Sequence, residues 1–255
     1  MFKRRSISAF LLATAAAQVL ITPALAADAP AKYAVLSLIG SKLNLVTAQN
    51  PTGSNFDRNI KQSVPLTKAL FDNQALATIQ DLLLTRQPPR DVALYLSSPT
   101  ALLAPNELFV GKKAALPAAL IDGMRADGAT HLLLLSRNPQ EAMLQMVGSN
   151  IGHGRLEGVG FYLDRDTVIN AAESQESNRS FLAPYVYLRL SLIELAGGNV
   201  LAEQTIRRST MLSASTSKTS VNPWDALGPA EKIDLLNELL ADELKLAVAA
   251  VLAGR

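Results

Sequence analysis

The stretch ALPAALIDGMRADGATHLLLLS, residues 115–136, decides the fold class of this chain. Its first part predicts a helix over 115–127, because apolar residues recur every three to four positions and Gly128 follows as a C-terminal cap. Residues 130–136 contain a run of four leucines, apolar on both faces, which is typical of a central strand covered on both sides. Together with a strand predicted over 91–97, they form a strand–helix–strand unit with a parallel, right-handed crossover.

Two β-hairpins are predicted on either side of this unit. Residues 33–39 and 42–48 are β-rich runs separated by Gly40-Ser41, the order typical of a type II′ turn. Residues 185–195 alternate well, turn at a Gly-Gly pair and return over 200–208 as the second hairpin.

Three further helices and one more strand are expected. Asp72 is predicted to cap a helix that ends near residue 86, and Asn138 is predicted to cap a short helix ending near 146. A long amphipathic helix is expected to begin at Gly228-Pro229 and to end near 253. A strand is expected over 159–164. The result is a single α/β (α+β) domain: a mixed sheet with two hairpins, one βαβ unit and a C-terminal helix packed on it.

The N-terminus predicts export. Residues 1–26 combine Lys3, Arg4 and Arg5 with an apolar stretch and the small-residue pattern Ala24-Leu25-Ala26, which is typical of a signal peptide cleaved after Ala26. We therefore expect residues 27–255 to form one soluble periplasmic domain. No later stretch is long enough for a transmembrane helix, and the chain has no cysteine, so no lipid anchor is expected.

Composition argues against several classes of function. Without the signal peptide, 21 Lys and Arg remain against 22 Asp and Glu, with no long basic run, so nucleic-acid binding is not expected. The two histidines, His131 and His153, do not have metal-ligand spacing, and no cofactor motif is present. We expect no metal, no cofactor and no enzymatic activity.

Side chains that could bind a ligand or a partner are concentrated in two polar segments. One is the segment 49–65, and the other is the glycine-rich segment 148–155, whose backbone amides could hold an anion together with its basic side chains. Trp224, the only tryptophan, is expected to join the last helix to the sheet or to contact a partner. The candidate ligand- or partner-binding residues are Ser54, Asn55, Asp57, Arg58, His153, Arg155 and Trp224.

Three long polar segments, 49–65, 165–182 and 209–221, are predicted as loops. Loops of this length in a compact domain tend to be functional or disordered. If all three leave from one end of the sheet, we expect that end to be the working surface.

Several segments resemble a known group of periplasmic domains. The helix-then-strand segment LIDGMRADGATHLLLLS (120–136), the hairpin YVYLRLSLIELAGGNVLAEQTIRRS (185–209) and the strand AVLSLIG (34–40) resemble domains typified by the TolB N-terminal domain, the penicillin-binding-protein activator LpoB and the curli secretion protein CsgG. LEGVGFYLD (156–164) and NPWDALGPAEK (222–232) resemble segments of uncharacterised proteobacterial secreted proteins. The resemblance implies a non-enzymatic domain that docks onto other envelope proteins. Lipid-anchored members carry a cysteine that this chain lacks.

Three functions follow in order of preference. The first is an accessory or adaptor protein that contacts another envelope protein, and an exposed apolar patch would favour it. The second is a binding protein for a small anionic ligand, which a concave charged pocket would favour. The third is a hydrolase using Ser54 or the pair Asp164 and Asp166, which needs a hydroxyl within hydrogen-bond reach of a histidine.

Overall fold

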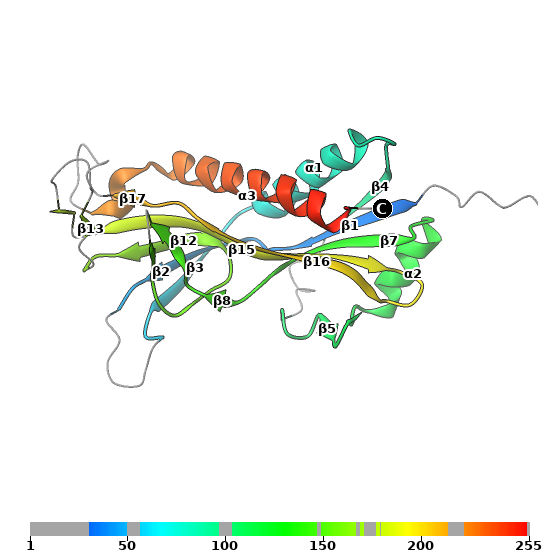
Figure 1. Ribbon diagram of the computed structural model, residues 1–255, viewed down its shortest axis with the longest axis horizontal. Helices are drawn as coiled ribbons and strands as arrows, with labels where there is room; N and C mark the ends of the chain where they lie inside the picture. The colour runs from blue at the N-terminus through cyan, green and yellow to red at the C-terminus, as the bar shows by residue number, and fades with distance from the viewer. Residues whose placement is uncertain are drawn as a thin grey trace, which may run out of the picture.

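The computed structural model describes residues 31–49, 57–96, 104–146, 149–166, 169–170, 177–178, 180–213 and 222–253. It confirms a mixed α/β domain with a large sheet and a long C-terminal helix packed on it, and this helix is one of three α-helices in the described residues (Figure 1). In this described part of the chain, nine strands form the large sheet. They are β1 (Lys32–Leu38), β2 (Lys42–Thr47), β3 (Ile60–Pro65), β4 (Asp91–Leu96), β7 (His131–Arg137), β12 (Gly158–Asp164), β15 (Phe181–Glu194), β16 (Val200–Ser209) and β17 (Leu212–Ser213).

The helices and short strands complete the chain. The helices are α1 (Leu70–Leu84), α2 (Ala118–Ala126) and α3 (Pro229–Val251), with a 3₁₀ turn η3 (Pro223–Ala226) before the last. The short strands pair locally and are β5 (Phe109–Val110), β6 (Lys113–Ala114), β8 (Gln140–Glu141), β9 (Leu144–Met146), β10 (Ser149–Ile151), β11 (Arg155–Leu156), β13 (Ile169–Asn170) and β14 (Ser177–Asn178).

Strand β15 is the central strand of the sheet, and its 14 residues are long enough to pair with two strands, one after the other, along one edge. β12 pairs with its first half and β7 with its second half, both antiparallel. The other edge of β15 pairs with β16, as the predicted second hairpin requires. The sheet therefore divides into two branches, β12–β2–β3 and β7–β1–β4.

The predicted hairpin between β1 and β2 is wrong. β1 pairs in parallel with β4 and β7, whereas β2 pairs with β3 and β12, so the two strands lie in different branches. Both run antiparallel to β15, and Gly40-Ser41 is therefore a step between branches rather than a reversal of direction. The parallel arrangement predicted for β4 and β7 is confirmed, with β1 between them.

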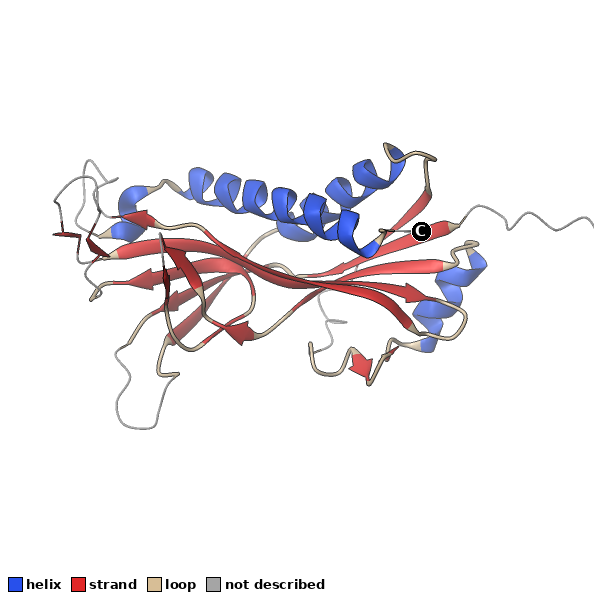
Figure 2. Cartoon of the chain, in the orientation of Figure 1, coloured by secondary structure: helices blue, strands red, loops and turns tan. Residues whose placement is uncertain are grey.

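One face of the sheet, the helical face, carries α1 and α3, and the opposite, non-helical face carries irregular segments and the short helix α2 (Figure 2). On the helical face, α1 and α3 bury a core cluster that includes Phe161, Leu188 and Leu240. On the other face, α2 and its flanking residues cover the branch of β7 and β1, burying residues such as Leu134. The segment 138–157 covers the branch of β12 and β2, burying three tyrosines of β12 and β15.

Helix α1 differs from its prediction at its start. It begins at Leu70, so Asp72 lies inside its first turn rather than at the N-cap. Its carboxylate instead accepts hydrogen bonds from the Ser37 hydroxyl at 2.6 Å and from the backbone N–H groups of Ile39 and Gly40 at 3.0 Å. Asp72 thereby binds the helix to the step between the two branches.

The short helix predicted after Asn138 is wrong, because Gln140–Glu141 and Leu144–Met146 are extended and pair with β11 and β10. Asn138 is buried, and its amide oxygen accepts a hydrogen bond from Arg189 instead of capping a helix. The other helices agree closely: Gly128 follows α2 with a positive φ of 84°, and the Glu231 carboxylate accepts the Gly228 N–H at the start of α3.

Residues 60–65, predicted as loop, form the edge strand β3. All six of its residues are exposed, so no alternation of apolar and polar residues marks it in the sequence. Among the helices of the described residues, none combines the length and the apolar character needed to cross a membrane.

Candidate functional site

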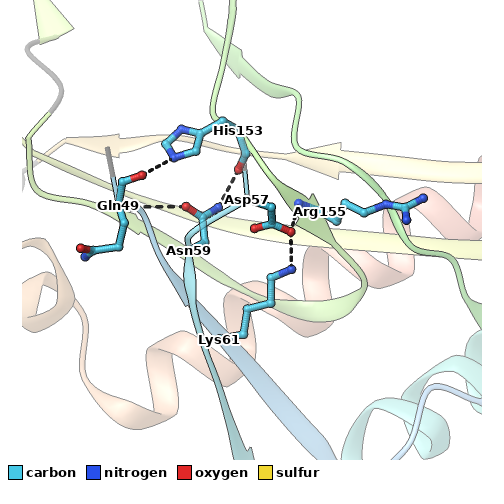
Figure 3. Close-up of polar contacts among 6 residues, drawn as sticks. All are labelled: Gln49, Asp57, Asn59, Lys61, His153 and Arg155. Atoms are coloured by element: carbon cyan, nitrogen blue, oxygen red, sulfur yellow. Dashed lines mark hydrogen bonds and ion pairs between the residues drawn. The ribbon is translucent and has the colours of Figure 1, made fainter. Parts of the chain in front are cut away.

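The structure brings together three of the seven predicted site residues, on the face of the sheet opposite α3. Asp57, His153 and Arg155 meet where the start of the β3 segment crosses the glycine-rich segment (Figure 3). Ser54 and Asn55 lie outside the described residues, and Arg58 is exposed beside Asp57.

The Asp57 carboxylate joins the two segments. It accepts a hydrogen bond from the Lys61 ammonium at 2.7 Å and one from the backbone N–H of Arg155 at 3.2 Å. Burial alone would raise the pKa of Asp57. The hydrogen bond and charge of Lys61, with the backbone N–H groups of Arg155 and Asn59, outweigh it and hold the pKa below its ordinary value. Asp57 is therefore ionised at neutral pH and acts as a structural anion rather than as a base.

Asn59 and His153 form a second crossing beside the first. The Asn59 amide donates to the carbonyl of His153 at 2.6 Å and accepts the Gln49 N–H at 3.2 Å. The His153 Nε2 lies 2.7 Å from the carbonyl of Gln49, and because a carbonyl only accepts, Nε2 carries the proton. The ring thus fastens the end of β2 to the glycine-rich segment.

Asn59 and Lys61 were not predicted as site residues. Together with Asp57 they stand at every second position, so they share one face of an extended segment. Arg58 and Gln62 at the alternate positions are polar as well, so no alternation in the sequence marked this face.

Gly154 makes this crossing sterically possible. Its φ is +79°, and a Cβ atom placed on it would lie 2.5 Å from Oδ1 of Asp57 and 2.6 Å from the amide nitrogen of Asn59. Any side chain at this position would therefore displace the side chains of Asp57 and Asn59 from their present contacts.

A hydrolase was expected to need a hydroxyl within hydrogen-bond reach of a histidine. Two residues that were not candidates in the sequence place a hydroxyl there. The Thr130 hydroxyl lies 2.9 Å from Nδ1 of His131, and the Tyr162 hydroxyl lies 3.5 Å from Nδ1 of His153. Both hydroxyls also contact the backbone, Thr130 at the Lys32 carbonyl and Tyr162 at the His153 N–H. Burial raises the pKa of Tyr162 to about 12, which disfavours its use as a nucleophile.

The remaining candidates have structural contacts. Trp224 lies on the helical face, where its ring packs edge-on against Phe161 at 5.8 Å and faces the Lys232 ammonium at 4.3 Å. It joins η3 to the sheet and does not reach the crossing. Asp164 accepts the backbone N–H of Asp166 at 2.9 Å, a local turn rather than a pair of carboxyls facing a common centre.

A pocket of about 320 Å³ opens next to the crossing. Residues of β2 and β3 line it together with Pro139 and residues 155–157. Lys61, Arg155 and Glu157 are among its polar residues, and the fully buried Tyr185 also lines it. Within the described ranges, no three His, Asp or Glu side chains come close enough to hold a metal ion.

The register places the flanks of the three long polar segments at one end of the sheet. Thr47, at the end of β2, pairs with Leu163 and with Ile60. Next to it, Asp164 pairs with Phe181, which also pairs with Ser213. The described residues on either side of 50–56, those before residue 167 and those before residue 214 therefore share this end, which also holds the crossing.

Comparison with known proteins assigns no family, since no family model and no curated protein matches the chain. Several solved structures are similar in fold at low identity. The PelC dodecamer structure from Paraburkholderia phytofirmans is 12% identical over 85% of this chain and 86% of that chain, with a TM-score of 0.32. A neuraminyllactose-binding hemagglutinin homolog from Helicobacter pylori is 9% identical over 88% and 87%, with a TM-score of 0.42. Matches of this size assign neither a family nor a function.

Proposed function

We propose that this chain is a non-enzymatic accessory protein of the periplasm that binds another envelope protein along the outer edge of β3. The observation that carries the proposal is that edge. β3 is the last strand of its branch, and within the described residues only β2 pairs with it. An open strand edge presents unpaired N–H and C=O groups, which an extended segment of a partner can pair with.

The side chains of β3 favour the same interpretation. Ile60 and Val64 point to the helical face of the sheet and are 49% and 45% exposed. Isolated exposed apolar residues need no explanation, but two on one face of an open edge strand offer a partner both backbone pairing and apolar contact. Lys61 on the opposite face and Pro65 at the strand end are features that limit unspecific pairing of edges.

The placement of the polar segments supports this surface. The flanks of all three predicted long loops lie at the end of the sheet where β3 begins. The signal-peptide pattern of residues 1–26 supports a contact in the periplasm.

Site-specific photo-crosslinking in the native envelope tests the proposal. A photoreactive amino acid replaces Val64 on β3, and in the control it replaces Leu246, which is 67% exposed on α3. We expect the Val64 position to capture one or two stoichiometric partner proteins and the Leu246 position to capture none of them. Equal capture at both positions, capture of a second copy of this chain alone, or no capture would contradict the proposal.

A further inference from the structure

Three tyrosines on the non-helical face differ in whether their hydroxyl has a hydrogen-bond partner. Tyr162, Tyr185 and Tyr187 are all fully buried. The Tyr162 hydroxyl accepts the His153 N–H at 3.3 Å, and the Tyr187 hydroxyl accepts the Met143 N–H at 3.0 Å. The Tyr185 hydroxyl has no hydrogen-bond partner among the described residues. Buried tyrosine hydroxyls ordinarily have a partner, so this one indicates that a polar group completes the site.

Tyr185 can donate a hydrogen bond but needs an acceptor. Burial first, and then the nearby charge of Glu157, raise the pKa of its hydroxyl well above the ordinary value. The group is therefore protonated at every physiological pH. Its ring packs edge-on against Tyr187 at 5.5 Å, which fixes its direction.

Tyr185 lines the pocket of about 320 Å³ beside the crossing. This volume lies within the range of about 300–1,000 Å³ found for ligand pockets. It is also far larger than the roughly 30 Å³ that one water molecule occupies in the liquid. Leu156 and Val46 line the same pocket as Tyr185 and give it an apolar wall, so it can hold an organic body as well as a polar group.

The charged groups around the pocket have a net charge of +1. Lys61 is paired with Asp57 at 2.7 Å, and Glu157 is paired with Arg137 at 3.5 Å. Arg155 lines the same pocket, and its guanidinium makes no hydrogen bond or ion pair within the described residues. Only its backbone N–H is used, in the bond to Asp57.

We infer that this pocket binds a small free organic anion, with a carboxylate or phosphate oxygen accepting the Tyr185 hydroxyl and its charge facing Arg155. The site adds a ligand to the proposed function and does not depend on it, because the pocket and the outer edge of β3 are tested by separate variants. Lys61 connects the two: it is a β3 residue and lines the pocket, so an occupied pocket would also order the start of β3.

Calorimetric titration of the mature chain with succinate and with glycerol phosphate, at constant ionic strength, tests the inference. We expect at least one of the two to bind. Tyr185→Phe removes only the unpartnered hydroxyl, so it should leave the melting temperature unchanged or raise it. The same variant should weaken binding by roughly tenfold or more. Tyr187→Phe is the matched control: it should lower the melting temperature, because it loses the Met143 bond, and leave binding unchanged.

Arg155→Gln keeps the backbone bond to Asp57 and removes the charge, so it should weaken binding by roughly ten- to hundredfold. Binding of neither probe, or binding that Tyr185→Phe and Arg155→Gln leave intact, would overturn the inference. A parallel arm uses vesicles of phosphatidylglycerol, whose headgroup carries the same glycerol phosphate. Binding to these vesicles without binding of the free compound would overturn a site for a free anion.

Discussion

At the scale of single residues, the site depends on contacts between segments that are distant in the chain. Asp57 and Arg155 are 98 positions apart, and Asn59 and His153 are 94 apart. Gly154 allows both contacts, because its left-handed backbone and missing side chain leave room for the side chains of Asp57 and Asn59.

Gly154→Ala should therefore destabilise the protein more than the same change at a glycine with free space. A left-handed conformation costs an L-residue about 1–2 kcal/mol, and overpacking adds about 1–3 kcal/mol. Gly111 is the control, since its φ is +60° and nothing lies within 4 Å of the added Cβ. Urea unfolding should show a loss of about 2–4 kcal/mol for Gly154→Ala and of about 1–2 kcal/mol for Gly111→Ala. Equal losses would show that the crossing is not tightly packed.

The lowered pKa of Asp57 predicts a pH dependence with a definite sign. A carboxyl whose folded pKa lies below its unfolded value adds stability above the unfolded pKa and loses it as pH falls through the folded pKa. Asp57→Asn should thus be less stable than the natural chain at neutral pH, and the difference should shrink below about pH 4. Urea unfolding at a series of pH values measures the difference. A constant or growing difference in acid would contradict the ion pair with Lys61.

At the scale of elements, strands and helices with a regular hydrophobic pattern were predictable from the sequence. The hairpin of β15 and β16 and the helical period of α3 are confirmed. α3 buries one regular face, whereas β15 is buried on both faces of the sheet. β3 was missed because both of its faces are exposed, and the helix predicted after Asn138 was wrong because pairing with β10 and β11 overrode local capping signals. Asp57, His153 and Arg155 were predicted as candidates, but their meeting depends on the pairing of β2 with β12, which no local pattern encodes.

The step between β1 and β2 shows how an element can override turn chemistry. Gly-Ser favours a hairpin locally, yet Asp72 of α1 accepts the N–H groups of Ile39 and Gly40. Asp72→Ala would leave these two donors and the Ser37 hydroxyl buried without an acceptor. We expect a loss of at least about 3 kcal/mol in thermal or urea unfolding, because each of the three unsatisfied buried donors costs about 1–3 kcal/mol.

Asp81→Ala is the control on the same helix, where the side chain is exposed. Surface substitutions of this kind change stability by less than about 0.5 kcal/mol. Similar losses for the two variants would show that Asp72 does not hold α1 to the sheet.

At the scale of the whole molecule, the length of β15 explains the architecture. β15 has 14 residues and pairs with β12 along one half and with β7 along the other. The sheet therefore divides into two branches, whose outer strands are β3 and β4. The fold class was predictable from local patterns, but the branching was not, because nothing in the pattern of β12 or β7 says which half of β15 each pairs with. The Tyr185 pocket was missed for a related reason: in the sequence, a buried tyrosine of a central strand resembles any core residue.

The most direct test of the central claim, that the outer edge of β3 binds an envelope partner, is quantitative co-purification. The natural chain, a double variant Ile60→Lys and Val64→Lys, and Leu246→Lys carry the same C-terminal tag and are captured after crosslinking in the native envelope. All three positions are exposed, so the fold should be retained. We expect the partner to be recovered with the natural chain and with Leu246→Lys but to be lost with the double variant. The reason is that charged residues block pairing at an edge strand. Unchanged recovery with the double variant would contradict it.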